Sequence, residues 1–207
     1  PLLGTEVHVP GDLSAAAFLV AGAVLAPRSE LVIRNVGVNP TRRAFLDLLL
    51  RSGGKIDLED ERLLDEEPVA HLRVRSGTLR AFHVGPSESG GLIDELPLLA
   101  VLAAFAEGES VIRGAAELRV KESDRIDAVT RGLRAIGASV EEHADGWTIQ
   151  GEGRVRGGVV DAAGDHRIAM AFLIAGLRAK NGVTVTGAEA AAVSDPDFLA
   201  RLRGVRR

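Results

Sequence analysis

The stretch Ala15-Ala16-Ala17-Phe18-Leu19-Val20 decides the fold, because the helix that it predicts is apolar on every side. Such a helix has to be covered all round, which places it inside the molecule rather than on its surface. A second run, Leu96 to Ala106, has the same character. Each run is about a dozen residues long, well short of the ~20 residues that cross a bilayer. We therefore expect two buried helices and no membrane span.

An aspartate stands just before each apolar helix. Asp12 and Asp94 precede the two runs above, and Asp165 precedes a third buried helix that extends to about Leu177. Because an aspartate side chain accepts hydrogen bonds from the free N–H groups of a helix start, each of the three predicts an N-cap. A strand follows each helix, at Leu31–Arg34, Val111–Arg113 and Val183–Val185. Either three α/β units alternate by chance, or one supersecondary unit is repeated three times.

The repeat predicts three units, at about residues 5–80, 81–155 and 156–207. The first begins with an expected strand at Glu6–Val9. Closing strands are expected in the first two units, near residues 55–58 and 71–75 and near residues 139–141 and 147–149. The third unit is shortened. Because the apolar helices need cover on all sides, the repeat favours a pseudo-threefold domain with three central helices packed together and strands outside.

Composition places the chain among ordinary soluble globular proteins. Its 207 residues are enough for one domain with a sizeable core or for two small ones. The formal net charge of -4 argues against a general nucleic-acid-binding surface. The absence of cysteine excludes disulfides, a thiol nucleophile and cysteine zinc sites, and it is compatible with a cytoplasmic location. The five histidines are too scattered to predict a metal site, and the opening residues show no charged-then-apolar leader.

The stretch Arg119-Val120-Lys121-Glu122-Ser123-Asp124-Arg125-Ile126 is unusually dense in charge. A helix from about Ser123 is predicted by apolar positions at spacings of 3, 4 and 3, namely Ile126, Val129, Leu133 and Ile136, with Gly137 as its end. Lys121 and Arg125 are four residues apart, so they would share one flank of the positive helix N-terminus. The stretch is either a solvated helix start or a site for an anionic substrate.

Three segments together resemble one enzyme family. The charged stretch, Leu92-Ile93-Asp94-Glu95-Leu96-Pro97 and Gly164-Asp165-His166-Arg167-Ile168-Ala169-Met170 are similar to signatures of the 5-enolpyruvylshikimate-3-phosphate synthases, in that family's order and approximate spacing. The likeness runs from about Val9 to Phe198 and resembles only the C-terminal half of such an enzyme. It implies an α/β (α+β) fold, a pseudo-threefold inside-out α/β barrel of βαβαββ-type units with helices inside and sheets outside. Residues 1–207 would form a single lobe of three repeat units.

The resemblance implies a transferase of the shikimate pathway, which makes aromatic amino acids. Family members transfer the enolpyruvyl group of phosphoenolpyruvate to the 5-hydroxyl of shikimate 3-phosphate and release phosphate, without a metal or organic cofactor. The two substrates would bind between this lobe and an N-terminal lobe that the chain lacks. We therefore expect a cytoplasmic protein that binds neither nucleic acid nor membrane, folds alone and shows no turnover without the other lobe.

The resemblance also assigns roles to residues. Asp94 would accept the 5-hydroxyl proton and contact the shikimate ring, and Glu122 would protonate the methylene carbon of phosphoenolpyruvate. Arg125 and Arg167 would bind phosphoenolpyruvate, whose carboxylate and phosphate match the paired N–H donors of a guanidinium. Lys121 would contact shikimate 3-phosphate.

Other positions complete the expected site or depart from the family pattern. Glu117 is a further candidate for substrate binding, since some members carry there an asparagine that touches the shikimate. Asp165 is expected to cap the third helix and to orient Arg167, while His166 is expected to be structural. Val193 stands where some members have a lysine on phosphoenolpyruvate, so that contact is not expected here.

Three other functions stay open. UDP-N-acetylglucosamine enolpyruvyl transferases share the architecture, although the charged signatures are more similar to the shikimate enzymes. The run Gly151-Glu152-Gly153-Arg154 is a weak sign of a dinucleotide-binding loop, because no helix is expected to follow it. A non-catalytic anion-binding domain is the third. Titration with the two substrates, followed by an assay with the complementary lobe, separates these cases.

Overall fold

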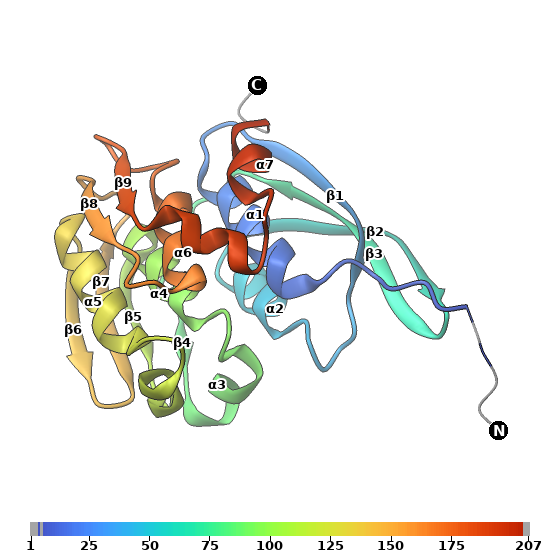
Figure 1. Cartoon of the computed structure of the whole chain (residues 1–207), viewed down its shortest axis with the longest axis horizontal. Helices are drawn as coiled ribbons and strands as arrows, with labels where there is room; N and C mark the ends of the chain where they lie inside the picture. The colour runs from blue at the N-terminus through green and yellow to red at the C-terminus, as the bar shows by residue number, and fades with distance from the viewer. Residues whose placement is uncertain (1–3, 5, 205–207) are drawn as a thin grey trace.

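The centre of the molecule consists of three apolar helices. The computed structural model describes Gly4 and residues 6–204, and in it α1 (Leu13–Leu25), α4 (Leu96–Phe105) and α6 (His166–Ala175) contact one another. Every residue of α4 is buried. The helices lie between the sheets, with β1 to β3 on one side and β4 to β7 on the other (Figure 1). The apolar runs therefore form buried helices, as the sequence predicts.

Within the described residues, three separate sheets cover these helices. The first has the order β1-β3-β2, the second the order β4-β5-β7-β6, and the third is the parallel pair β8-β9. Their strands are β1 (Glu30–Gly37), β2 (Lys55–Leu64), β3 (Glu67–Arg75), β4 (His83–Val84), β5 (Glu107–Ile112), β6 (Ser139–His143), β7 (Gly146–Glu152), β8 (Gly158–Asp161) and β9 (Val183–Thr186). The hairpins β2-β3 and β6-β7 are the closing strand pairs that the sequence predicts in the first two units.

One connection recurs around each central helix. Gly11, just before α1, forms a parallel bridge to Val36 of β1. Strand β4 pairs in parallel with β5 on either side of α4, and β8 pairs in parallel with β9 on either side of α6. Parallel neighbours need such a helical crossover. With helices inside and sheets outside each time, the predicted fold class, a pseudo-threefold inside-out α/β barrel, is confirmed.

Smaller helices surround this centre. They are α2 (Ala44–Arg51), α3 (Pro86–Leu92), α5 (Arg125–Ala135), α7 (Phe198–Gly204) and the 3₁₀ helices η1 (Ala116–Val120) and η2 (Ala188–Val193). Helix α5 buries Ile126, Val129 and Leu133 on one face, as their spacing requires. The buried Trp147 of β7 donates from Nε1 to the Ile126 carbonyl at 3.1 Å, which ties the second sheet to α5.

Two local details differ from the predictions. The helix predicted from about Ser123 is present and begins at Arg125, with Asp124 as its N-cap, whose Oδ1 accepts from the Asp127 N–H at 3.0 Å. Lys121 therefore lies before the helix and does not share its flank with Arg125. Residues 6–9 form no strand, since the backbone and ring of His8 bind the Asp65 carboxylate at the β2-β3 turn instead of a neighbouring strand.

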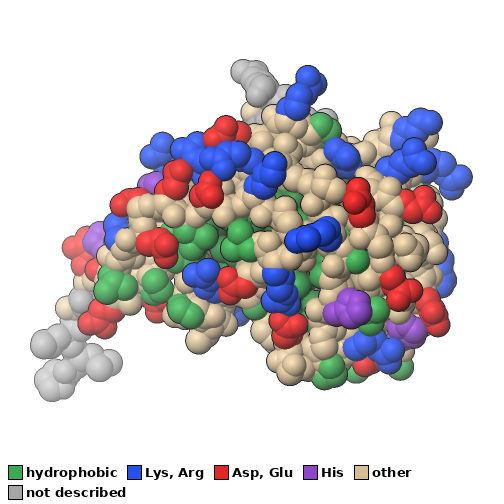
Figure 2. Space-filling model, turned by 180° about the vertical axis from the view of Figure 1, so that it is seen from behind, with side chains coloured by type: hydrophobic (Ala, Val, Ile, Leu, Met, Phe, Trp, Pro, Cys, Tyr) green, Lys and Arg blue, Asp and Glu red, His purple; other side chains and the backbone are tan. Residues whose placement is uncertain are grey.

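The outer surface carries both signs of charge. Seen from behind, acidic, basic and apolar side chains are interspersed, and basic ones gather along the upper edge (Figure 2). Within Gly4 and residues 6–204, no helix combines the length and apolar character that a membrane crossing requires.

Candidate active site

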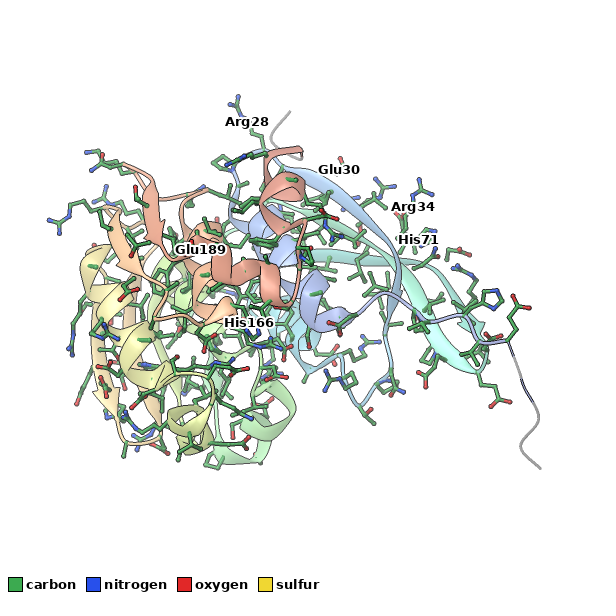
Figure 3. All side chains as sticks on the ribbon, viewed as in Figure 1. Arg28, Glu30, Arg34, His71, His166 and Glu189 are labelled. Carbon is green, nitrogen blue, oxygen red and sulfur yellow. The ribbon has the colours of Figure 1, made fainter. Side chains whose placement is uncertain are left out.

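The three central helices start on the same side of the molecule. Arg167, in the first turn of α6, reaches Asp94 just before α4. A small hollow between the starts of α1 and α6 is lined by Asp12, Ser14 and Arg167, among others. In Figure 3, His166, the first residue of α6, lies near the centre of the view. Because helix N-termini carry free N–H groups and partial positive charge, their convergence favours an anionic ligand.

Asp94, which lies just before α4, is bound by Arg167 and does not bind the start of α4. Nη1 of Arg167 donates to the Asp94 carbonyl at 2.9 Å, and its Nη2 lies 3.4 Å from Asp94 Oδ2. The prediction that Asp94 caps the second apolar helix is wrong, because Glu95 occupies the cap position and makes no side-chain cap bond. The side chain of Asp94 is 37% exposed and that of Arg167 is 15% exposed. A carboxyl that a ligand can reach therefore lies beside a mostly buried guanidinium.

Asp165 is the buried centre of the site. Its Oδ1 accepts from the Arg167 N–H at 2.9 Å, so it caps α6 as predicted. Its Oδ2 accepts from Nε of Arg125 at 2.8 Å and from the Ser123 hydroxyl at 3.0 Å. The prediction that Asp165 orients the Arg167 side chain is wrong, since the guanidinium that it holds belongs to Arg125. Burial raises the pKa of Asp165, but the Arg125 hydrogen bond and charge, with the other donors, outweigh burial and hold this pKa below its usual value.

Glu122 and Lys121 lie in the loop before α5. Nη2 of Arg125 donates to Glu122 Oε2 at 2.6 Å, and the Glu122 side chain is still 52% exposed. Arg125 itself is almost fully buried, and its guanidinium forms ion pairs with two carboxylates, those of Glu122 and Asp165. Lys121 forms an ion pair with Glu117 of η1. The structure thus joins Glu122 through Arg125 to Asp165 and leaves Lys121 and Glu117 as a separate pair.

A further group of residues was not predicted from the sequence. Glu95 is only 8% exposed, and the hydroxyl of Ser14 on α1 lies beside its carboxyl. Ser14 also accepts from Nη2 of Arg42 at 3.2 Å. Burial raises the pKa of Glu95 above its usual value, and the Ser14 hydrogen bond and the charges of Arg167 and Arg42 oppose that rise only in part. The sequence signal for this group was Glu95, an acidic residue directly before the apolar run Leu96 to Ala106.

His166 lies near Asp165, Arg167 and Arg125, and its ring makes no hydrogen bond to them. Burial lowers the pKa of His166, and the charges of Arg167 and Arg125 lower it further against the opposing carboxylates. The imidazole is therefore neutral near pH 7. Its expected structural role stays a prediction.

The arrangement can bind anions and move protons. Asp94 and Glu122 are partly exposed carboxyls, each beside a guanidinium, and carboxyl groups can accept or donate protons to a bound substrate. Guanidinium groups offer paired donors to carboxylate or phosphate. In the part of the chain that the structure describes, no group of three or more His, Asp or Glu side chains is arranged to hold a metal ion.

Comparison with known proteins identifies relatives that match nearly the whole length of this chain. Residues 2–202 match the family model described as EPSP synthase (3-phosphoshikimate 1-carboxyvinyltransferase). A 3-phosphoshikimate 1-carboxyvinyltransferase from Geobacter sulfurreducens is 51% identical over 199 residues, which cover 96% of this chain and 46% of the relative. The protein of the same name from Thermosynechococcus vestitus is 52% identical over 204 residues, which cover 99% of this chain and 46% of the relative.

Solved structures agree with these relatives. An EPSP synthase from Acinetobacter baumannii matches with a TM-score of 0.92 at 39% identity, over 99% of this chain and 48% of that one. The enolpyruvyl transferase NikO from Streptomyces tendae, with a TM-score of 0.73 at 22% identity, shares the fold. The chain spans about half the length of the curated relatives it matches. By sequence along almost all of its length, and by structure, the chain belongs to the EPSP synthase family.

Proposed function

We propose that this chain is one lobe of an EPSP synthase and supplies the acid–base residues for enolpyruvyl transfer. The substrates are phosphoenolpyruvate and shikimate 3-phosphate, and the products are the enolpyruvyl ether at the 5-hydroxyl and phosphate. One observation carries the proposal. The Asp94–Arg167 contact and the hydrogen-bonded series Glu122, Arg125 and Asp165 lie at adjoining helix starts. These groups come from distant parts of the chain and suit a reaction between two anions.

Asp94 and Glu122 divide the proton transfers in this proposal. Asp94 takes the proton of the 5-hydroxyl as that oxygen bonds to C2 of phosphoenolpyruvate, and Glu122 gives a proton to the methylene carbon. The C–O bond to phosphate of the resulting tetrahedral intermediate then breaks, the leaving phosphate takes up the proton that Asp94 had accepted, and the methyl carbon returns a proton to Glu122, which restores the double bond. Both side chains are exposed enough to touch a substrate, at 37% and 52%.

The cations would place the substrates. Arg167 would bind phosphoenolpyruvate, since its guanidinium already stands at Asp94. Arg125 can take its predicted part in binding phosphoenolpyruvate only if its pair with Glu122 opens. Lys121 would bind shikimate 3-phosphate and exchange its present partner Glu117 for the ligand.

The wider organisation is part of the same proposal. The chain would form a single lobe of three units, at about residues 5–80, 81–155 and 156–207, in keeping with the parallel bridge of Gly11 to Val36 and the two parallel strand pairs β4-β5 and β8-β9. A second lobe would complete the site, because the chain matches only 46% of the relative from Geobacter sulfurreducens. The cytoplasmic location stays a prediction.

The test combines this chain with the unmatched half of the Geobacter sulfurreducens relative and measures phosphate release from the two substrates. Glu122→Gln should lower kcat by about 10²–10⁴-fold, the usual contribution of a general acid–base group, and leave substrate binding in place. The matched control is Glu109→Gln, on the exposed side of β5, which should behave like the parent. Near-normal turnover of Glu122→Gln would remove its assigned role. Product from UDP-N-acetylglucosamine instead of shikimate 3-phosphate would favour the other enolpyruvyl transferases.

A further inference from the structure

Arg119, near the end of η1, binds a residue on the far side of the loop that carries Lys121 and Glu122. Residues 121–124 belong to no helix or strand and lead into α5. Nη1 of Arg119 donates to Asp124 Oδ2 at 2.9 Å, across the four residues that separate them. Oδ1 of Asp124 caps α5 at the same time. The Arg119–Asp124 ion pair therefore closes the loop against the start of a helix.

Other donors of Arg119 bind the turn between β6 and β7. Nε donates to the Ala144 carbonyl at 2.9 Å, and Nη2 donates to the His143 carbonyl at 2.8 Å and to Glu142 Oε1 at 3.0 Å. The flat guanidinium fork serves several acceptors in one plane, which a lysine ammonium cannot do in the same geometry. With its donors bound on both sides, Arg119 joins the loop to a hairpin of the second sheet.

The same turn also holds the chain before η1. The carboxylate of Asp145 accepts from Nε of Arg113 at 2.7 Å and from the Gly114 N–H at 2.9 Å. The Asp145 carbonyl accepts from the Ala115 N–H at 2.8 Å. These bonds lie at the start of η1, whereas Arg119 lies near its end, so the turn supports η1 at both ends. A support of this kind keeps the side chains of a functional site in a fixed geometry.

We propose that Arg119 is a positioning residue, which holds Lys121 and Glu122 where they meet shikimate 3-phosphate and the methylene carbon of phosphoenolpyruvate. This inference rests on the proposed function of the site. Arg119 acts through the loop without touching a substrate, because each nitrogen of its guanidinium already donates to the protein. Misplacing a catalytic group by about 1 Å can lower a rate by about 10²-fold, so the support of the loop matters for turnover.

The first test measures the opening of the loop in this chain alone. The sequence has three lysines, Lys55, Lys121 and Lys180, so a lysine-specific protease distinguishes the loop from the rest of the chain. Cleavage of a folded protein follows the population of locally opened states. Arg119→Gln should make cleavage after Lys121 roughly tenfold faster and leave cleavage after Lys180 at the parent's rate. Each rate is divided by that of the same variant unfolded in urea, which corrects for effects on the protease itself.

Two further variants sharpen this test. Asp124→Asn removes the ion pair with Arg119 but keeps a side-chain acceptor for the α5 cap, so it should speed cleavage after Lys121 in the same direction. Arg131→Gln is the matched control, because it removes an exposed ion pair of α5 that does not span the loop. Unchanged cleavage after Lys121 in Arg119→Gln, or an equal increase after all three lysines, would overturn the proposal.

The second test measures kinetics in the assembly with the unmatched half of the relative. Arg119→Gln should lower kcat by about 10–10²-fold through Glu122 and raise KM for shikimate 3-phosphate through Lys121. The KM for phosphoenolpyruvate should change little, since Arg167 lies on α6 and not on the loop. Arg119→Lys should recover part of the loss. Added to Glu122→Gln, Arg119→Gln should lower kcat no further, because the acid that it positions is already absent.

The two tests separate the inference from the function on which it rests. An inactive parent assembly contradicts the proposed function, and the cleavage test, which needs no substrate, then still decides whether Arg119 holds the loop. An active assembly in which Arg119→Gln has the parent's kcat and KM overturns the positioning role alone. A loss of kcat that adds in full to the loss in Glu122→Gln overturns it as well.

Discussion

At the scale of single residues, the Arg125–Asp165 pair determines how the site is held. Both side chains are buried, and the carboxylate takes donors from Ser123, Arg125 and the backbone of Arg167. The pair joins the start of α5 to the start of α6 and leaves one Arg125 nitrogen bound to Glu122. Such a pair holds its geometry only while every donor stays in place.

Asp165→Asn should lower the free energy of unfolding by about 3–5 kcal/mol, because it leaves the buried Arg125 without its buried counter-ion. Urea unfolding at pH 7 measures the loss. The matched control is Asp127→Asn, which breaks an exposed pair with Arg131 and should change stability by less than ~1 kcal/mol. Similar small losses in both variants would contradict a dominant role for the buried pair.

The same pair makes stability depend on pH. Burial raises the pKa of Asp165, but the bond and charge of Arg125 outweigh it, so the folded pKa lies below the unfolded value of ~3.9. This contribution is present above the unfolded pKa and is lost as pH falls through the folded pKa. The gap in stability between the parent and Asp165→Asn should therefore narrow in acid, and a gap that stays constant would rule out the charge as its source.

At the scale of elements, aspartates that look alike in the sequence have different functions. Asp12 caps α1 by accepting from the N–H groups of Ser14 and Ala15, whereas Asp94 caps nothing. Asp12→Ala should lower the free energy of unfolding by about 1 kcal/mol, and Asp94→Ala should lower it by less but abolish turnover in the assembly with the unmatched half. Thermal unfolding and phosphate release measure the two effects. Normal turnover of folded Asp94→Ala would end its assignment as the base.

Helices α5 and α6 meet at a glycine. A Cβ on Gly132 would lie 2.2 Å from the ring of the buried Phe172, so a larger residue forces that ring to move. Gly132→Ala should lower the free energy of unfolding by about 1–3 kcal/mol despite the better helix propensity of alanine. Urea unfolding tests this, and adding Phe172→Leu should recover part of the loss. If the changes in the free energy of unfolding caused by the two substitutions simply add, residues 132 and 172 do not interact in this way.

The helices are predictable from the sequence because their burial is visible in it. An apolar run on all sides specifies a central helix, and the amphipathic spacing from Ile126 to Leu133 specifies an outer one. Side-chain partners are not visible in the same way. Arg125 contacts Asp165 across 40 residues of sequence, and Arg167 contacts Asp94 across 73. Only the fold therefore decides that the Arg125 guanidinium is buried and that Asp94 does not cap α4.

At the scale of the whole molecule, the three apolar helices form one shared core, while the charged groups lie at their starts. The core joins α1, α4 and α6 directly and is buried within this chain. The site has a different requirement. In the proposed function, two substrates that carry phosphates and a carboxylate need donors on every side and exclusion of water during transfer, and this chain would supply only Arg125, Arg167 and, in the loop before α5, Lys121.

The isolated chain should therefore fold but not turn over. Denaturant unfolding followed by circular dichroism and by the fluorescence of the buried Trp147 should give one coincident transition, because that residue packs on the same core. Phosphate release from phosphoenolpyruvate and shikimate 3-phosphate should stay at background and rise only when the unmatched half of a relative is added. Turnover by the chain alone would mean that one wall is enough for catalysis. Two separate unfolding transitions would mean that the units around α1, α4 and α6 are held together less tightly than their shared core requires.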